Sequence, residues 1–225
     1  MTIYLVRHAY SRHNAPDPSD FPYDYRVAES EGRDPSLSPM GIEQANCLGA
    51  RLKDIQIDYV LCSPAHRTIR TAIGAISQKK EKPALELMQE LIEYGLPKEM
   101  TFAPLNIMED MYPGHVFTKI PNVLDSRLYE TSDAAGYARA KYIRDYVLNR
   151  FGPDDNILIV SHGAFCSRFL ISAILGLPFE TIGKTKFGAF NAYLSTFVVA
   201  ADGTEVRGRH INETSYLGEW GKYNA

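Results

Sequence analysis

Two short segments near opposite ends of the chain each place a histidine after a run of apolar residues. The first, IYLVRHA, ends in Arg7, His8 and Ala9, and the second, ILIVSHG, ends in His162 and Gly163. A neutral imidazole is a competent nucleophile and proton carrier near neutral pH. The small residue after each histidine would let a ligand approach the backbone closely. We therefore interpret His8 and His162 as candidate catalytic residues of one site.

Arginines and neutral polar side chains accompany these histidines and could bind an anion. Arg7 directly precedes His8, and Arg67 lies in LCSPAHRTIRTA, where Ser-Pro ends a predicted strand and starts a predicted helix. Guanidinium groups match the oxygens of phosphate, and helix N-termini add oriented N–H groups. Ser11 and Asn14 could donate to the remaining oxygens, or they could simply close the turn after the strand. These residue types predict a phosphate-binding pocket.

The elements that must position these residues are the strands and helices of an α/β sheet. Strands are predicted over residues 2–8, 57–63 and 156–162, and residues 84–90 fit a third strand or a short helical turn, of which the strand is preferred. Helices are predicted over residues 38–54, 64–79, 134–151 and 164–175. Their alternation predicts a three-layer sandwich with a mostly parallel central sheet and helices on both faces. Ligands bind beyond the carboxyl ends of such strands, so the two histidines should meet there.

Two further segments complete the predicted domain. The sequence NAYLSTFVVAADGTEVRGRHI reads as a hairpin through Asp202 and Gly203, a strong two-residue turn signal. Between about residues 95 and 130, Gly, Pro, Met and aromatic residues intermingle without a period, which indicates an inserted cap region or lid over the site. A length of 225 residues suits one domain. We therefore expect residues 1–225 to form a single domain.

Composition argues against several classes of partner. The 24 basic and 27 acidic side chains are interspersed, so neither nucleic acid nor an anionic membrane is expected as a partner. The sequence shows no secretory signal and no apolar stretch of membrane-spanning length. Three widely spaced cysteines read as reduced thiols, which favours a cytoplasmic location. The remaining histidines lack metal-ligand spacing, so no metal or other cofactor is expected, and the oligomeric state stays open.

Five blocks, in order along the chain, resemble the histidine phosphatase superfamily, also called phosphoglycerate mutase-like. They are LVRHAYSRHN, DPSLSPMGIEQA, CSPAHRTIRTA, VSHG and NAYLSTFVVAADGTEVRGRHINETSYL. The resemblance covers most of the chain outside residues 95–135. Ala9 departs from the pattern, because the family usually has glycine there. The resemblance implies a metal-independent phosphomonoester hydrolase that acts on a small phosphorylated molecule.

The resemblance also implies a role for each candidate residue. His8 would attack the phosphorus and form a phosphohistidine, which water then hydrolyses. His162 and the two arginines would surround the phosphoryl oxygens, where charge resides in the transition state. The residues implied in phosphate binding are Arg7, Arg67, Ser11, Asn14 and Gly163.

A glutamate would protonate the leaving alkoxide and then deprotonate the attacking water. The family commonly has a Glu four residues before a Gly, but Leu91 occupies that position relative to Gly95. Glu90 and Glu93 bracket it. Because LELMQE resembles a variant in which a strand ends on Gln-Glu, Glu90 is preferred, with Glu93 as the alternative.

Two other functions are compatible with the same residues. A phosphoglycerate mutase would need additional cations over the pocket, and residues 95–130 offer only Lys98, Lys119 and Arg127. A non-catalytic relative would keep the pocket to bind a phosphorylated ligand or a protein, but such a module has no need of an unprotonated nucleophile. We therefore expect hydrolysis, with these two functions as alternatives.

Overall fold

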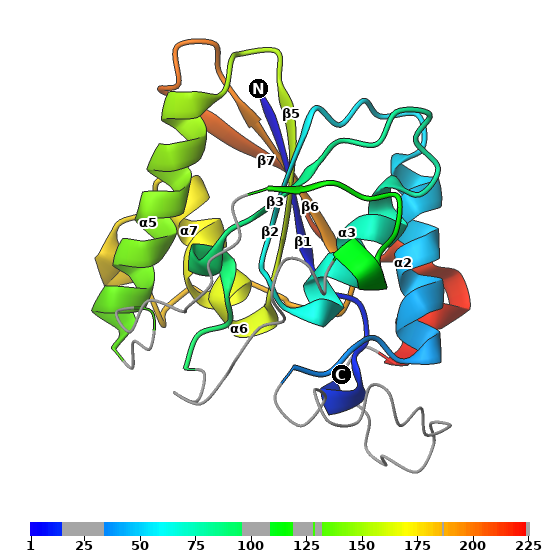
Figure 1. The fold of residues 1–225 in the computed structure, drawn as a ribbon. Coiled ribbons are helices and arrows are strands. Elements are labelled where there is room, and N and C mark those ends of the chain that lie inside the picture. Colours follow the sequence, from blue (N-terminus) through cyan, green and yellow to red (C-terminus); the bar gives the residue numbers. More distant parts are fainter. Residues whose placement is uncertain (15–33, 96–108, 119–127, 129–131, 186, 224–225) are drawn as a thin grey trace.

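The computed structural model describes the chain apart from residues 15–33, 96–108, 119–127, 129–131, 186 and 224–225. Its centre is a sheet of seven strands in the described part, in the order β4-β3-β2-β5-β1-β6-β7 (Figure 1). The strands are β1 (Thr2–Arg7), β2 (Tyr59–Cys62), β3 (Leu85–Leu87), β4 (Phe117–Thr118), β5 (Asn156–Ser161), β6 (Leu194–Val199) and β7 (Val206–Glu213). The strands from β4 to β1 in this order are parallel, and β6 and β7 pair antiparallel. This confirms the predicted mostly parallel sheet.

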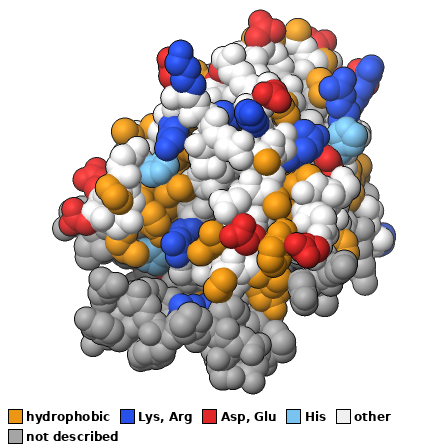
Figure 2. Space-filling model, turned by 90° about the vertical axis from the view of Figure 1, so that its right-hand side faces the viewer, with side chains coloured by type: hydrophobic (Ala, Val, Ile, Leu, Met, Phe, Trp, Pro, Cys, Tyr) orange, Lys and Arg blue, Asp and Glu red, His pale blue; other side chains and the backbone are white. Residues whose placement is uncertain are grey.

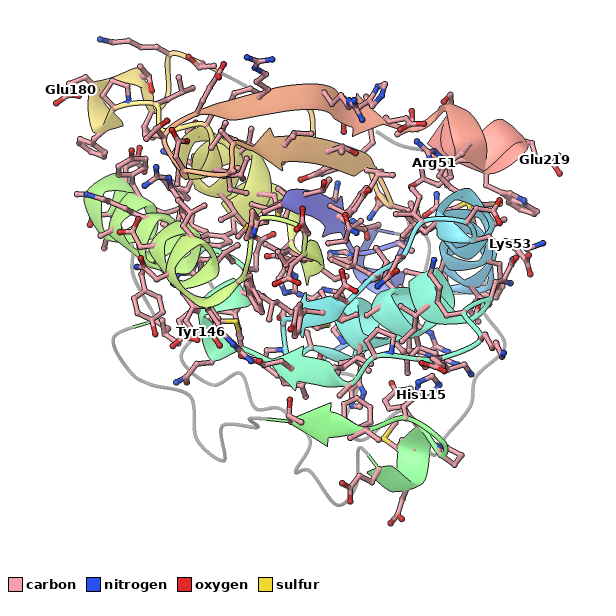
Figure 3. The ribbon with its side chains drawn as sticks, turned by 90° about the horizontal axis from the view of Figure 1, so that it is seen from above. Arg51, Lys53, His115, Tyr146, Glu180 and Glu219 are labelled. Carbon is pink, nitrogen blue, oxygen red and sulfur yellow. The ribbon has the colours of Figure 1, made fainter. Side chains whose placement is uncertain are left out.

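Helices cover both faces of the sheet, as predicted (Figures 1 and 3). The helices are α2 (Pro39–Leu52), α3 (His66–Ile76), α5 (Asp133–Arg150), α6 (Gly163–Phe165) and α7 (Ile171–Ile174). Alternate residues of β1 face opposite layers: Tyr4 and Val6 belong to the core under α2 and α3, whereas Ile3 and Leu5 belong to the core under α5 and α7. Apolar residues on both faces are typical of a central strand in a parallel sheet.

Helix α2 begins and packs for reasons that are visible in the sequence. Ser38 is the N-cap and accepts a hydrogen bond from the Gly41 backbone N–H at 3.0 Å, which satisfies a donor that the helix itself leaves unpaired. Further along, Gly49 and Gly74 allow α2 and α3 to approach closely. A Cβ on Gly49 would lie 2.4 Å from the Gly74 carbonyl oxygen, and one on Gly74 would lie 2.6 Å from the Cβ of Ala45.

The predicted strand over residues 84–90 is shorter than expected. It ends at Leu87 and is followed by a single 3-10 turn, Gln89–Leu91. Most of the predicted cap region lies outside the described residues. Its described part contains β4, where Phe117 pairs with Leu85, so this piece belongs to the sheet. A two-residue strand is too short for an alternating pattern to reveal.

The C-terminal half shows two further differences from the sequence pattern. The predicted hairpin is present, but the loop is longer than two residues: the Ala200 N–H donates to the Glu205 carbonyl at 2.9 Å, and Gly203 adopts a φ of +71°. The helix predicted over residues 164–175 contains a π-helical turn, Cys166–Leu170, between α6 and α7. Such turns occur often near functional sites, and the periodicity of apolar residues in a sequence does not predict them.

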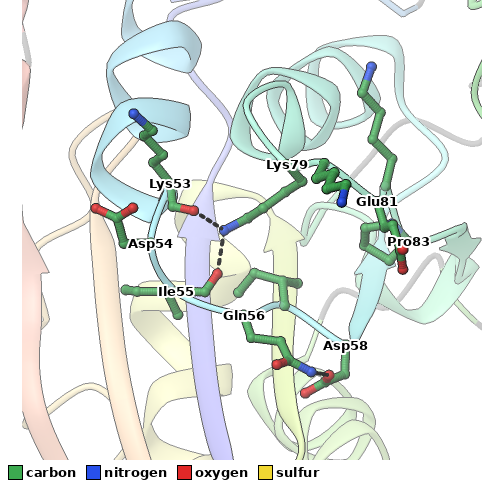
Figure 4. A pocket seen from close by; sticks show the side chains of 11 residues that line it. Lys53, Asp54, Ile55, Gln56, Asp58, Lys79, Glu81 and Pro83 are labelled. Atoms are coloured by element: carbon green, nitrogen blue, oxygen red, sulfur yellow. Dashed lines mark hydrogen bonds between the residues drawn. The ribbon is translucent and has the colours of Figure 1, made fainter.

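A cavity of about 540 Å³ lies at the amino ends of β2 and β3, lined by residues 53–58 and 79–83 (Figure 4). Lys79 holds this region together, because its Nζ donates to the carbonyl oxygens of Lys53 at 3.1 Å and of Leu52 and Ile55. The cavity is at the opposite end of the strands from the two histidines.

On the side of the molecule that carries α2, basic and acidic side chains lie interspersed (Figure 2). None of the helices in the described ranges is long and apolar enough to cross a membrane.

Candidate active site

The pairing of β1 with β5 brings the two histidine segments together. Arg7 is in register with Ser161, so His8 and His162 leave their strands side by side. Their ring centroids are 5.3 Å apart with an interplanar angle of 66°, and both side chains are buried. The structure therefore confirms that the two histidines, although far apart in sequence, meet beyond the carboxyl ends of the strands.

The backbone around His8 determines which of its ring nitrogens carries the proton. Nδ1 lies 2.8 Å from the carbonyl oxygen of Ala9, and a carbonyl oxygen can only accept, so Nδ1 carries a proton, and in the neutral ring the lone pair is on Nε2. The His8 carbonyl accepts hydrogen bonds from Asn191 Nδ2 and the Ala192 N–H, both at 3.2 Å. The Ala9 N–H donates to Thr71 Oγ1 at 2.9 Å. These bonds fix the orientation of the ring, and Nε2 is the nitrogen that a neutral His8 would use as a nucleophile.

His162 is held in the opposite tautomer. Arg67 Nη2 lies 3.0 Å from its Nδ1, and because a guanidinium only donates, Nδ1 accepts. Its Nε2 therefore carries the proton and donates to Ser63 Oγ at 2.8 Å. Burial lowers the pKa of His162 well below its ordinary value, and the nearby charge of Arg67 lowers it further. His162 is thus neutral near neutral pH.

Asp34 fixes Arg67 and is the site residue that sequence reasoning missed. Its Oδ1 pairs with Arg67 Nη1 at 3.2 Å, and its Oδ2 accepts from the His66 N–H at 3.0 Å, at the start of α3. Burial raises the pKa of Asp34 to about 6, although Arg67 and the His66 N–H act to lower it. Asp34 begins the block DPSLSPMGIEQA, but its side-chain role depends on contacts with a distant helix. Burial disfavours the charged form of Arg67 as well, and therefore lowers the pKa of this guanidinium.

Arg7 is held beside Gly163, which provides the space for it. Arg7 Nη1 donates to the Ala189 carbonyl, whereas its buried Nε has no hydrogen-bond partner among the described residues. A Cβ on Gly163 would lie 2.8 Å from that Nε. Burial lowers the pKa of Arg7, and the charge of Glu93 opposes this. The sequence predicts that Gly163 leaves space for a ligand, and the structure shows that the Arg7 guanidinium lies in this space.

Ser11 and Asn14 close the turn after β1. Asn14 Oδ1 accepts hydrogen bonds from the Ser11 N–H at 3.1 Å, from Ser11 Oγ at 2.9 Å and from Asn191 Nδ2 at 3.4 Å. Since Asn191 also donates to the His8 carbonyl, the turn is tied to the nucleophile segment. The turn-closing interpretation of both residues is therefore confirmed, and their phosphate contacts stay a prediction.

The two candidate acids lie in different surroundings. Glu93 Oε1 accepts from the Phe165 N–H at 2.8 Å, and Oε2 accepts from the Ala164 N–H at 3.2 Å, so the carboxylate sits against the turn that follows His162. The charge of Glu93 also acts on both arginines of the site. Glu90 instead contacts α5 through its backbone carbonyl, which accepts from Arg139. No described contact links the Glu90 carboxylate to either histidine.

The fold and this site define an α/β protein with a candidate oxyanion-binding pocket that contains two buried histidines, the buried Arg67 and the half-buried Arg7. The chain belongs to the histidine phosphatase superfamily (branch 1), whose family model matches residues 3–212. No group of three or more His, Cys, Asp or Glu side chains in the described part of the chain could hold a metal ion.

One curated protein is similar to this chain in sequence, and several solved structures are similar to it in fold. An ecdysteroid-phosphate phosphatase of Drosophila melanogaster is 28% identical over 183 residues, which are 73% of this chain and 23% of the relative, so this chain spans about a quarter of that protein. The solved structure of Bacillus stearothermophilus YhfR matches with a TM-score of 0.64 at 18% identity, over 96% of this chain and 98% of that one. An ecdysone phosphate phosphatase from Bombix mori, in complex with tungstate, matches with a TM-score of 0.63 at 17% identity, over 87% and 88% of the two chains.

Proposed function

We propose that this chain is a phosphomonoester hydrolase that uses His8 as its nucleophile and requires no metal. The observation that carries the proposal is the 2.8 Å contact of His8 Nδ1 with the Ala9 carbonyl, because it assigns a proton to Nδ1 and so makes Nε2 the nitrogen that would attack, close to His162 and its partner Arg67. Membership of the histidine phosphatase superfamily supports the same chemistry. So does the name of the Drosophila relative, an ecdysteroid-phosphate phosphatase.

The first step transfers the phosphoryl group to His8. Nε2 attacks the phosphorus, the bond from phosphorus to the ester oxygen breaks, and the alcohol leaves with that electron pair. Arg7, Arg67 and His162 would surround the three equatorial oxygens and stabilise their charge, and for this the Nε2–H of His162 would exchange Ser63 Oγ for a phosphoryl oxygen. The buried Nε of Arg7, which has no partner among the described residues, supplies a donor for one of these oxygens. Preorganised donors of this kind typically contribute about 2.7–4 kcal/mol each.

We assign the proton transfers to Glu93 rather than to Glu90. The Glu93 carboxylate lies against the turn that follows His162, whereas Glu90 contacts α5 through its backbone. Glu93 would donate a proton to the departing alkoxide and then remove one from water. The water oxygen bonds to phosphorus, the N–P bond breaks, and inorganic phosphate leaves. Such proton transfers typically contribute about 10²–10⁴-fold to the rate.

The substrate class is a small phosphorylated molecule. The solved relatives include a phosphoserine phosphatase from Entamoeba histolytica in complex with 3-phosphoglyceric acid, and the insect proteins act on steroid phosphates according to their names.

Cys47, Cys62 and Cys166 are all free, which supports the proposed cytoplasmic location.

Phosphate release from a panel of monoesters, measured in chelator with His8→Ala as the blank, tests the proposal. The panel includes 3-phosphoglycerate. Release that needs His8 and is insensitive to chelator is the expected result. Isomerisation of 3-phosphoglycerate without net release would instead identify a mutase, and binding without turnover would identify a phospho-ligand-binding protein.

A further inference from the structure

We propose that Arg139 is the positioning residue for Glu93, an inference that rests on the proposed role of Glu93 as the proton donor. Arg139 lies on α5 and is 7% exposed. Its Nη1 donates to the carbonyl oxygens of Glu90 at 2.7 Å and of Ile92 at 2.8 Å. These two carbonyls flank Leu91 in the turn that leads directly into Glu93. One guanidinium thus holds the backbone that carries the carboxylate.

The same guanidinium also contacts the residue that receives the carboxylate. Arg139 Cζ lies 3.8 Å from the centroid of the Phe165 ring. The Phe165 N–H in turn donates to Glu93 Oε1 at 2.8 Å. Arg139 therefore links both sides of the Glu93 anchor: the turn before the carboxylate and the start of α6 against which the carboxylate rests.

Arginine suits position 139 better than lysine does. A guanidinium is planar and can stack on an aromatic face while its edge donates to carbonyl oxygens, whereas a lysine ammonium is a point charge without a planar face. Arg139→Lys should therefore keep the buried charge but lose the stacking on Phe165. The turn has one further anchor, because Ser161 Oγ donates to the Leu91 carbonyl at 2.7 Å. This second anchor would keep the turn folded when Arg139 is replaced.

Displacement of a general acid has a specific kinetic signature. An aliphatic alkoxide needs a proton as it leaves, whereas 4-nitrophenolate is a stable anion that needs little protonation. The parameter kcat/KM reports the steps up to the departure of this first product. A misplaced acid therefore lowers kcat/KM for an alkyl phosphate much more than for 4-nitrophenyl phosphate, while general loosening of the fold lowers both alike.

The test compares Arg139→Met with Arg144→Met, a matched substitution on the same helix at a half-buried residue that pairs with Asp145. We expect Arg139→Met to lower kcat/KM for an alkyl phosphate at least about tenfold more than for 4-nitrophenyl phosphate, and Arg144→Met to change neither. Equal losses on both substrates, or no loss, would overturn the inference. If Arg139→Met does not fold, Arg139→Lys takes its place, with the same selective loss expected.

Glu93→Gln separates this inference from the proposed function. A selective loss of the alkyl ester in Glu93→Gln together with the same pattern in Arg139→Met supports both. The selective loss in Glu93→Gln alone leaves the proposed acid standing and overturns the role of Arg139. A Glu93→Gln variant without any selectivity overturns the assignment of the acid, and the positioning role with it.

Discussion

Replacing Gly163 by alanine would disturb one guanidinium and little else. The new Cβ would lie 2.8 Å from Arg7 Nε and 3.0 Å from Cζ, whereas ordinary contact begins at 3.4 Å. The guanidinium must therefore move by about 0.6 Å, and it cannot move freely because Nη1 donates to the Ala189 carbonyl. The backbone of Gly163 lies outside the left-handed region, so alanine is allowed there. The expected defect is thus one of position rather than of folding.

The size of this defect follows from the displacement. Misplacement of a catalytic group by about 1 Å can cost on the order of 10²-fold in rate, so a shift of about 0.6 Å should cost on the order of tenfold. We expect kcat/KM for 4-nitrophenyl phosphate to fall by about this factor and the inhibition constant of tungstate to rise similarly. Because alanine is the better helix former at the start of α6, the free energy of unfolding should change by less than about 1 kcal/mol.

Gly152→Ala is the matched control, since its Cβ would meet only Asp155 Oδ2, at an ordinary 3.6 Å. Its kinetics should match those of the unmodified protein. A Gly163→Ala variant with unchanged kcat/KM and unchanged tungstate inhibition would refute the placement of Arg7 in the oxyanion pocket. A variant that loses activity only because it unfolds would refute the argument from local contact.

Three further substitutions test other contacts of the site. Asp34→Asn removes one partner of the buried ion pair with Arg67, so denaturant titration should show a free energy of unfolding lower by about 3 kcal/mol; a loss below about 1 kcal/mol would contradict a buried pair. Gly41→Ala would place its Cβ 1.9 Å from the Tyr10 carbonyl oxygen, so the loop after the nucleophile must shift, and thermal unfolding should reveal a loss of about 1–3 kcal/mol or more. Burial lowers the pKa of His66 from 6.5 to about 4, so its contribution to stability is complete above pH 6.5 and is lost as the pH falls toward 4. Between pH 7 and pH 5 the free energy of unfolding should therefore fall by about 2 kcal/mol less in His66→Asn than in the unmodified protein. Equal decreases in the two proteins would refute a neutral buried imidazole.

The meeting of His8 with His162 could be predicted because it depends on strand ends alone. Each histidine follows an apolar strand, and parallel strands bring their carboxyl ends to one edge. The start of α2 was equally predictable, because Ser38 and Pro39 act locally on the first turn. Local patterns therefore sufficed wherever the cause was local.

Other features depend on contacts between distant segments, which no local pattern records. Asp34 pairs with a residue 33 positions away, and Arg139 contacts carbonyls 49 and 47 positions away. Spacing alone does not decide between Glu90 and Glu93, because the path of the chain through and after the 3-10 turn Gln89–Leu91 brings the Glu93 carboxylate to the start of α6. The π-helical turn in the helix after His162 likewise has no period to reveal it.

Trapping the phosphorylated intermediate tests most directly whether His8 carries the phosphoryl group. The protein is mixed with a radiolabelled phosphomonoester, quenched in alkali within the first turnover, and digested to locate the label. If His8 is the nucleophile, the peptide that contains His8 carries an acid-labile, alkali-stable label, and His8→Ala carries none. Turnover without labelled protein, or a label that persists in His8→Ala, would contradict it.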